Sequence, residues 1–513
     1  MIQPADDASR EFPTLTTTGE ATQLIVDGKP CIMLAGEVHN SSSSSLAYME
    51  AEVWDRLVDL HCNTALVPVS WELVEPEEGR FDFTLVDGLL AAARQRGLRL
   101  VPLWFGTWKN TWSSYAPAWV KTDLDRFPRA QPLPGKNCGA ISCLCDAACE
   151  ADARAFAAFM AHLREADGSD HTVVMVQVEN ETGLLGAGRD HSRAAEEAFR
   201  QPVPQQLLDH IGEHEAALHE EFRWLWRTSG RMAAGAWPQV FGHGADEVFM
   251  AWHIARYVDR VAAAGQAEHP LPLFANAWLV QHDNQKAGEY PSGGPVSRMM
   301  DVWRLAAPHI ALVAPDIYLP NFAAVCADYA RPGNPLLIPE ARRTEVAAAN
   351  AFYAIGQHDA LGFAPFGIEG MPADDLLGAS YELLAHMMPV VAAHHGTGRM
   401  IGILQGDEET QEAELGGYRL RVRFRGPIEE GTPPGGGLVI ATADGEYIVA
   451  GLRFAVDFLP LRDAPQNVDF VALDEGTYHD GEWVQGRRLN GDEYRLVLGD
   501  QPCVRRARLY SYA

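Results

Sequence analysis

Two glutamates that each follow a run of apolar residues are the side chains best suited to chemistry in this chain. Residues 173–179 (VVMVQVE) lead into Asn180 and Glu181, and residues 336–339 (LLIP) lead into Glu340. A carboxylate at the end of a buried strand loses its hydration unless it is paired or takes part in chemistry. Glycoside cleavage requires two carboxyl groups, one protonated and one ionised. The pair Glu181 and Glu340 therefore indicates a glycoside hydrolase.

The elements that must position these acids recur between residues 31 and 395. Short apolar runs rich in Val, Ile and Leu lack strict alternation, which is typical of strands buried on both faces of a parallel sheet. Segments between them carry apolar residues at helical spacing, as in 46–60 and 152–165. The apolar runs cover residues 31–36, 64–69, 98–104, 172–178, 271–278, 310–318, 335–339 and 360–366.

This alternation of strands and helices predicts an α/β fold, a (β/α)8 TIM barrel over residues 31–395. Residues 1–30 are expected to be an irregular lead-in. A doubly wound parallel sheet is the alternative, and it is disfavoured because no glycine-rich phosphate turn follows the first apolar run.

Residues 396–513 have the character of a smaller, all-β accessory domain, sandwich-like in architecture. Residues 418–425 alternate apolar and basic side chains, as in a strand with one buried face. Residues 438–449 resemble a hairpin that turns at Asp444-Gly445. Bracing of the barrel and carbohydrate binding are both open as roles for this domain.

Three segments resemble glycoside hydrolase family 35, the β-galactosidases, and the resemblance spans most of residues 30–370. They are 177–183 (QVENETG), 116–119 (APAW) and 71–83, with the pattern Trp-x3-Glu-Pro-x2-Gly-x-Phe-x-Phe. The resemblance implies that Glu181, at the end of barrel strand four, is the acid/base and that Glu340, at the end of strand seven, is the nucleophile.

The same resemblance implies two further roles. Asn180 is expected to bind the sugar 2-hydroxyl, and Tyr318 is expected to hold the nucleophile ionised. Period-2 alternation would put Glu179 on the same face as Glu181, so the Asn-Glu pair decides for Glu181. Glu369 is the alternative nucleophile, and Glu340 is favoured because its strand is the seventh in our count.

Two loops depart from the family pattern and bring the sugar contacts into question. Residues 106–110 (GTWKN) stand where the family usually shows Ala-Glu-Trp, and residues 41–45 (SSSSS) replace an aromatic residue and an arginine. The Trp-Lys-Asn loop and the β-rich tail resemble a bacterial subgroup that includes enzymes acting on galactosylated plant polysaccharides.

Other polar and aromatic residues near predicted strand ends are candidates for substrate contact. Tryptophan rings stack on the apolar face of a sugar, although core filling is the common alternative. Trp278 is the best candidate for stacking, and Trp71 is a second one. Glu37 and Asn110 are expected to bind hydroxyl groups, while His39 suits a structural role equally well.

The acidic composition limits the partners of the chain. The formal net charge is −28 at pH 7, which disfavours nucleic acid and anionic membrane surfaces as ligands. No basic, apolar leader is visible at the start, so a cytoplasmic location is expected, or a periplasmic one if a signal has been removed. The expected partner is a small carbohydrate or oligosaccharide, and homo-oligomer formation is left open.

Four closely spaced cysteines, Cys138, Cys143, Cys145 and Cys149, leave two interpretations. Four thiolates can close a structural zinc site, but the paired CxxC arms of a zinc ribbon are missing. Free thiols or a local disulfide are therefore favoured. No cofactor and no catalytic metal are expected.

The sequence thus predicts a retaining enzyme that removes terminal β-linked galactose from oligosaccharides or plant-polysaccharide side chains. Glucoside, mannoside or arabinoside specificity on the same scaffold is the alternative. A non-catalytic carbohydrate-binding protein is a second alternative. A metal-dependent barrel hydrolase is disfavoured, because no His-x-His motif ends a strand.

Overall fold

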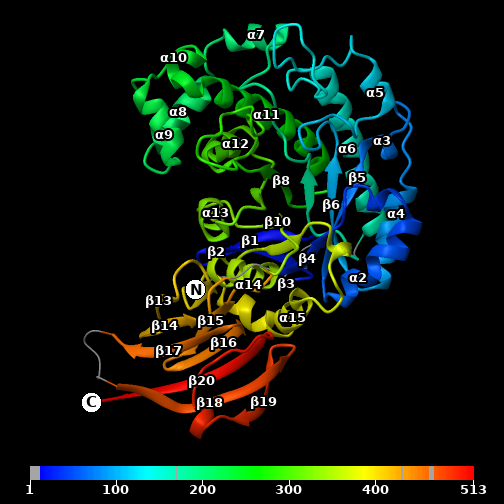
Figure 1. Cartoon of the computed structure of the whole chain (residues 1–513). Helices are drawn as coiled ribbons and strands as arrows, with labels where there is room; N and C mark the ends of the chain where they lie inside the picture. Colours follow the sequence, from blue (N-terminus) through cyan, green and yellow to red (C-terminus); the bar gives the residue numbers. More distant parts are fainter. Residues whose placement is uncertain (1–11, 169, 429–430, 462–466) are drawn as a thin grey trace, which may run out of the picture.

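The computed structural model describes residues 12–168, 170–428, 431–461 and 467–513. Eight parallel strands close into a barrel in the order β4 to β11, which confirms the predicted TIM barrel (Figure 1). The strands are β4 (Met33–Glu37), β5 (Thr64–Ser70), β6 (Arg99–Phe105), β7 (Val176–Val178), β8 (Leu273–Trp278), β9 (Leu312–Ile317), β10 (Ile338–Ala341) and β11 (Gly362–Pro365). Each strand lies within, or within two residues of, one of the apolar runs.

Helices cover the outside of the barrel and follow its strands in turn (Figure 1). They are α2 (Trp54–Asp59), α4 (Thr84–Gln95), α6 (Asp146–Asp167), α11 (Ala245–Glu268), α12 (Met300–Ala306), α13 (Phe322–Tyr329), α14 (Ala347–His358) and α15 (Leu376–His394). The helix expected over 46–60 is interrupted: α1 (Leu46–Tyr48) and α2 flank a π-helical turn, η2 (Met49–Val53).

Long insertions follow β6 and β7, and they form the upper part of the molecule in Figure 1. Their short helices are α5 (Ala118–Thr122), α7 (Arg193–Phe199), α8 (Gln205–His214), α9 (Glu220–Thr228) and α10 (Trp237–Phe241). A further short helix, α3 (Trp71–Val74), follows β5. These insertions lie at the C-terminal ends of the barrel strands, where barrel enzymes bind their ligands.

The expectation of an irregular lead-in is wrong for residues 14–31, which form a small antiparallel sheet. Strands β1 (Thr14–Thr18), β2 (Ala21–Val26) and β3 (Lys29–Cys31) pair in sequence order. Leu24 and Val26 pack with the side chains inside the barrel. The available signal was Asp27-Gly28, whose positive φ values of 51° and 74° suit the tight turn of a hairpin.

The C-terminal region contains only strands and one short 3-10 helix among its described residues, as an all-β domain requires. A six-stranded sheet has the order β12-β15-β16-β20-β18-β19, and a three-stranded sheet has the order β13-β14-β17. The two sheets share one apolar core. The strands are β12 (Met400–Leu404), β13 (Thr410–Leu415), β14 (Tyr418–Phe424), β15 (Gly436–Ala443), β16 (Glu446–Leu452), β17 (Phe454–Pro460), β18 (Asn467–His479), β19 (Glu482–Arg488) and β20 (Cys503–Tyr512).

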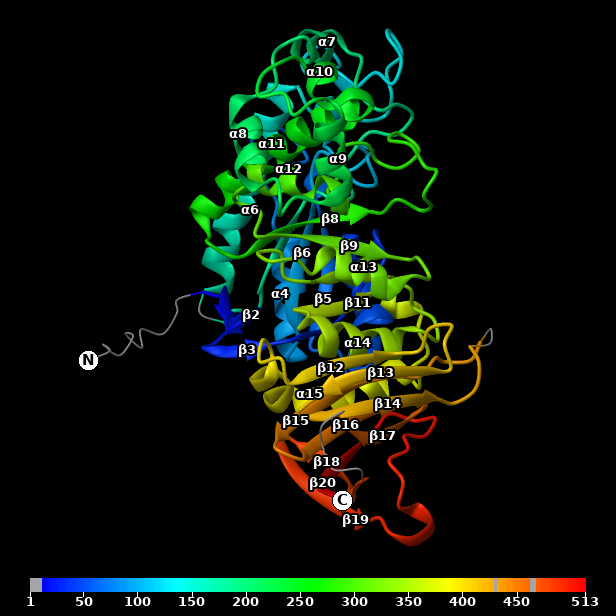
Figure 2. The same cartoon turned by 90° about the vertical axis from the view of Figure 1, so that its left-hand side faces the viewer.

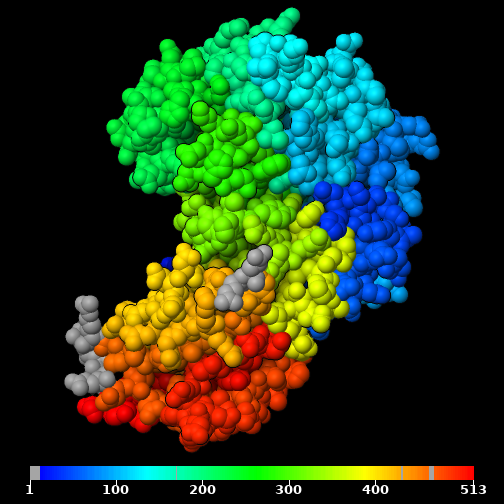
Figure 3. All heavy atoms as spheres, viewed as in Figure 1, coloured from blue at the N-terminus to red at the C-terminus, as the bar shows by residue number. Residues whose placement is uncertain are grey.

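Helices α14 and α15 join the two parts of the chain. Figure 2 shows the C-terminal strands beside α14 and α15, and Figure 3 shows the C-terminal region, orange to red, packed directly against the rest of the chain. Helix α15 is long and apolar enough to cross a membrane by composition alone, and 44% of its most apolar window is buried. Tyr381 of α15 donates to the carbonyls of Ala35 and Phe363, and the amide of Gly481 donates to the carbonyl of His386. The buried side chains of α15, among them Leu384, Met387 and Val391, belong to the main apolar core, which accounts for its apolar composition.

Candidate active site

The C-terminal ends of the barrel strands bring the predicted acids together. Glu37 is the last residue of β4, Glu340 lies in β10, and Glu181 follows the end of β7. Asp316, in β9, joins them. One carboxylate oxygen from each of Glu181, Asp316 and Glu340 lies within 4.8 Å of the others. Carboxyl groups are about 5–5.5 Å apart in retaining glycosidases and about 6.5–9.5 Å apart in inverting ones, so this spacing suits the retaining mechanism.

Glu181 is held in place by two asparagines. Its side chain accepts a hydrogen bond from the amide of Asn110, and its backbone N–H donates to Asn276 Oδ1 at 2.9 Å. Burial raises the pKa of Glu181 to about 7, and the charge of Glu340 adds to this effect. Its backbone has a positive φ of 44°, which is uncommon for a residue other than glycine. The raised pKa leaves this carboxyl protonated below neutral pH.

Glu340 differs from Glu181 because several donors surround it. Tyr318 donates its hydroxyl to Oε2 at 2.8 Å, and Asn180 donates its amide to Oε1 at 3.4 Å. The ammonium of Lys109 lies 3.9 Å from Oε1. Hydrogen bonds and a positive charge favour the ionised form of a carboxyl group. The site therefore holds one carboxyl suited to donate a proton and one suited to attack.

Unpaired acceptors surround the two acids. Both carboxylate oxygens of Glu37, Oδ1 of Asn180 and Oδ1 of Asp316 are buried and accept no hydrogen bond from the described residues. Burial, and after it the charge of Glu340, raises the pKa of both Glu37 and Asp316. Buried polar atoms normally have partners, so these acceptors suit a ligand that brings several hydroxyl donors.

Glu179 has a different place from Glu181, and the expectation that both share one face of a strand is wrong. Strand β7 ends at Val178, and Glu179 has a positive φ of 62°. Its carboxylate accepts the backbone N–H groups of Thr107 and Trp108 at 3.1 and 2.6 Å. Burial and neighbouring Asp152 raise its pKa. Glu179 thus anchors the loop that follows β6.

Glu369, the alternative nucleophile, anchors a second loop. Its Oε1 accepts the backbone N–H of His39 at 3.1 Å and the hydroxyl of Ser42 at 2.6 Å. The ring of His39 lies 3.0 Å from the same oxygen. These contacts fix the turn after β4, which gives both Glu369 and His39 a structural role in this arrangement.

The tryptophans near the strand ends divide between core and site. Trp71 is fully buried, donates to Glu75 at 2.9 Å and packs edge-on against Trp119. It offers no free face for a sugar, so the expectation that Trp71 contacts the substrate is wrong. Trp278 ends β8 in register with Asp316 of β9, and its side chain is only partly buried.

Three further residues at the site were not identified from the sequence. Asp316 and Asn276 lie within apolar runs. Asn276 donates to Asp316 at 2.7 Å and accepts the backbone N–H of Glu181, so the two residues help to position Glu181. Lys109 is 4% exposed, and its ammonium also lies over the ring of Phe105. The only signal for Lys109 was the unusual Trp-Lys-Asn loop, because burial of a lysine is not visible in a sequence.

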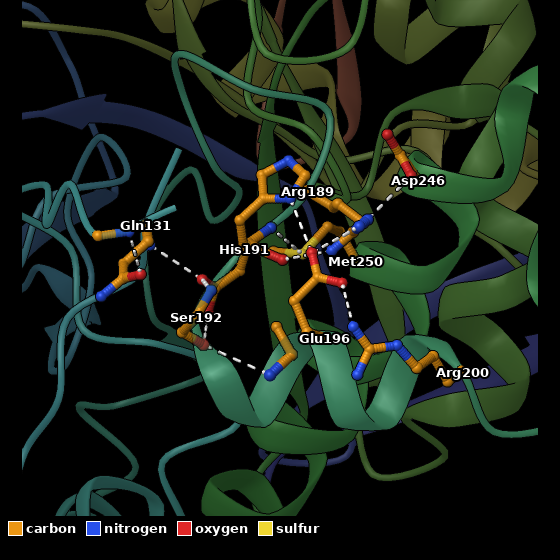
Figure 4. Close-up of polar contacts among 11 residues, drawn as sticks. Gln131, Arg189, His191, Ser192, Glu196, Arg200, Asp246 and Met250 are labelled. Atoms are coloured by element: carbon orange, nitrogen blue, oxygen red, sulfur yellow. Dashed lines mark hydrogen bonds and ion pairs between the residues drawn. The ribbon is translucent and has the colours of Figure 1, made fainter. Parts of the chain in front are cut away.

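The loops that carry these residues are tied together above the barrel. Figure 4 shows the polar contacts that join Gln131, in the loop after β6, to the segment around Ser192, in the loop after β7. Buried Asp190 accepts the N–H of Gln131 at 2.9 Å, the N–H of Ser192 at 2.7 Å and the hydroxyl of Ser142 at 2.6 Å. Glu196 binds Arg189 at 2.8 Å on the same network.

The four clustered cysteines do not converge. The thiols of Cys138, Cys145 and Cys149 are directed at three different backbone carbonyls. Among the described residues, the group of acids, histidines or cysteines close enough to hold a metal ion is Glu181, Asp316 and Glu340. The ammonium of Lys109 lies 3.9 Å from Glu340 in this group, so a positive charge is already present among the acids.

Comparison with known proteins supports the chemistry expected of this site. Residues 50–224 match a family model described as β-galactosidase, glycoside hydrolase family 42. Residues 377–498, from α15 through most of the C-terminal strands, match a domain of unknown function, DUF5597. The β-galactosidase of Xanthomonas manihotis is 36% identical over 85 residues, which are 16% of this chain and 14% of that protein. The chain therefore aligns with only a small part of that relative.

Solved structures of related architecture share little sequence with the chain. The β-galactosidase from Rahnella sp. R3 superposes with a TM-score of 0.48 and 16% identity, covering 74% of this chain and 58% of that one. The catalytic domain of β-amylase from Paenibacillus polymyxa gives a TM-score of 0.48 and 15% identity, covering 68% and 97%.

The family expected from the motifs needs correction. The family model that matches is that of family 42, not family 35. Both the motifs and the matched model are those of β-galactosidase families, and the model covers residues 50–224 of this chain.

Proposed function

We propose that this chain is a retaining glycoside hydrolase that removes terminal β-linked galactose from oligosaccharides or plant-polysaccharide side chains. One observation carries the proposal: Glu181 and Glu340 meet within the reach of a single sugar ring, one with a raised pKa and one surrounded by donors. The match of residues 50–224 to a β-galactosidase family supports the choice of sugar.

The reaction proceeds by double displacement. Glu340 attacks the anomeric carbon and forms a glycosyl ester, while Glu181 gives its proton to the leaving oxygen. Water then adds to the anomeric carbon and loses a proton to Glu181, and Glu340 leaves as a carboxylate. The sugar is released with its original β-configuration.

The remaining contacts orient the sugar. Asn180 binds the nucleophile through its amide, and its free oxygen accepts the neighbouring 2-hydroxyl. Tyr318 supports the ionised Glu340, and Asn110 holds Glu181. The free oxygens of Glu37 accept further hydroxyls, and Trp278 stacks on the apolar face of the ring.

A panel of nitrophenyl glycosides and a product time course test this function. The β-galactoside should be hydrolysed in preference to the glucoside, mannoside and arabinoside, with β-galactose as the first product in the NMR spectrum. A 2-fluoro galactoside should label Glu340. First appearance of α-galactose would contradict retention, and galactose binding in calorimetry without turnover would indicate a carbohydrate-binding protein.

The reaction as proposed needs no metal ion. Prolonged treatment with EDTA should leave kcat and KM for the β-galactoside unchanged, because a lysine ammonium rather than a metal ion supplies the positive charge beside the acids. Restoration of a lost activity by a divalent ion would instead indicate metal-dependent hydrolysis. A cytoplasmic location remains a proposal from the sequence.

A further inference from the structure

Four carboxyl groups and one ammonium share a buried site. Glu37, Glu181, Asp316 and Glu340 come from different parts of the barrel, and each is at most 6% exposed. Among the described residues, the ammonium of Lys109 faces all four of these acids. Several negative charges cannot remain ionised together at this distance without water. The number of ionised carboxyl groups is therefore limited by this single positive charge.

A tight turn gives Lys109 its place. The N–H of Lys109 donates to the carbonyl of Trp112 at 2.9 Å, and the N–H of Trp112 donates back at 3.0 Å. Between them, Asn110 and Thr111 have positive φ values of 48° and 69°. A β-branched threonine rarely adopts this conformation, and such outliers gather at functional sites. The turn directs Lys109 to Glu340 and Asn110 to Glu181.

The base of this turn is rigid. Glu179 binds the N–H groups of Thr107 and Trp108, and Asp152 accepts the hydroxyl of Thr107 at 2.7 Å. The ammonium of Lys109 lies 4.9 Å from the centre of the buried Phe105 ring, which is a favourable place for a cation. Lys109 therefore has little freedom to move away from the acids.

We propose that Lys109 is a positioning residue that serves as the counter-ion for whichever of the two reacting carboxyl groups is ionised. The inference rests on the proposed function. In the free enzyme Glu340 is the carboxylate and Glu181 is protonated. When Glu340 becomes a neutral ester, Glu181 has lost its proton to the leaving group. One carboxylate faces one ammonium in both states, so the site keeps its charge throughout the reaction.

The other titratable groups around Lys109 do not take this role. Glu37 and Asp316 face it from β4 and β9, and burial raises the pKa of both. Tyr318 is neutral, and burial with the charge of Glu340 raises its pKa as well. Arg342 and Arg343, which follow Glu340, bind the carbonyls of Tyr318 and Gly367 instead of the acids.

Substitution of Lys109 by methionine tests the proposal. Lys109→Met keeps the apolar stem and removes the positive charge that lies 3.9 Å from Glu340. The acidic limb of kcat/KM for 4-nitrophenyl β-galactoside should move up by about 1 pH unit or more. The value of kcat/KM at the optimum should fall by about 100-fold. In Lys109→Arg, which keeps a positive charge, the acidic limb should lie close to its pH in the unaltered protein.

The matched control is Lys121→Met, because Lys121 lies on the same insertion and pairs with Glu72 away from the acids. Its pH profile should equal that of the unaltered protein. Lys109→Gln, also uncharged, provides a second variant if Lys109→Met does not fold, as judged by its circular dichroism and melting temperature. A folded, uncharged variant whose acidic limb does not move would overturn the inference.

The two proposals fail in different ways. If the unaltered protein neither hydrolyses the galactoside nor is labelled at Glu340 by the 2-fluoro sugar, the proposed function is wrong. If the unaltered protein does both and the Lys109→Met profile keeps its shape, the function holds and the role of Lys109 is wrong.

Discussion

At the scale of single residues, the site separates four glutamates by their surroundings. Glu181 and Glu340 share one space, whereas Glu179 and Glu369 each accept backbone N–H groups of a loop. The sequence predicted the first pair from strand order, and it could not exclude the other two. Only their hydrogen-bond partners, which come from distant segments, distinguish chemistry from loop anchoring.

Removal of the nucleophile is expected to abolish turnover and to allow chemical rescue. Glu340→Gly should lower kcat by roughly 1000-fold or more, since the covalent step is lost. Azide should enter the space that is left and give an α-galactosyl azide, detectable by NMR. Glu369→Gln is the matched control and should keep most of its activity. Rescue of a Glu369→Gly variant instead would reverse the assignment.

The pH dependence of activity should follow the protonation of Glu181. Its pKa is raised to about 7, so the proton that the leaving group needs is present below this pH and lost above it. The profile of kcat/KM should therefore fall on the alkaline side near pH 7. Glu181→Gln should remove this limb while retaining activity on substrates with very good leaving groups. An alkaline limb that survives in Glu181→Gln would assign it to another group.

At the scale of elements, the loop after β6 is the part of the barrel whose structure could be predicted least from the sequence. Its motif, GTWKN, was visible only as a departure from a family pattern. In the fold it becomes a tight turn that is anchored by Glu179 and Asp152 and carries Lys109 and Asn110. The anchor and the turn are far apart in the chain, so no local pattern connects them.

Removal of the anchor should loosen the turn. Glu179→Ala leaves the N–H of Trp108 without its acceptor, which should lower the free energy of unfolding by about 1–3 kcal/mol. The value of kcat/KM should also fall, because Lys109 and Asn110 lose their support. Urea unfolding and steady-state kinetics measure the two effects. Glu197→Ala, at an exposed pair on α7, should change neither.

At the scale of the whole molecule, the barrel and the C-terminal sheets pack through small residues. A side chain at Gly356 of α14 would meet Leu438 of β15 at 2.7 Å and the backbone of Gly402 at 3.2 Å. Leu438, Ile440 and Ile448 belong to the same apolar core as the barrel helices. The composition of the tail predicted an all-β region, but not that its sheet would complete the barrel core.

Crowding at this interface should destabilise the protein without touching the chemistry. Gly356→Val should lower the free energy of unfolding by about 1–3 kcal/mol, since the helix cannot approach the sheet as closely. The melting temperature should drop, while kcat per folded molecule stays the same. Gly212→Val is the control, because the space around Gly212 on α8 is open. Equal destabilisation by both variants would show that the effect comes from helix propensity.

The sequence by itself determined the features that depend on neighbouring residues. Apolar runs and helical spacing predicted the barrel strands and their order, and strand order assigned Glu181 and Glu340 to the mouth of the barrel. The hairpin at Asp27-Gly28 also depends on neighbouring residues, although an irregular segment was expected there.

Only the tertiary structure decided which charged groups lie close enough to affect one another's protonation. Lys109 and Glu340 form an ion pair although they are 231 residues apart in the chain. Burial and distance set protonation, and both are properties of the assembled barrel rather than of any segment. Burial also decides the role of Trp71: the sequence predicts contact with the sugar, whereas in the structure this side chain lies in the core.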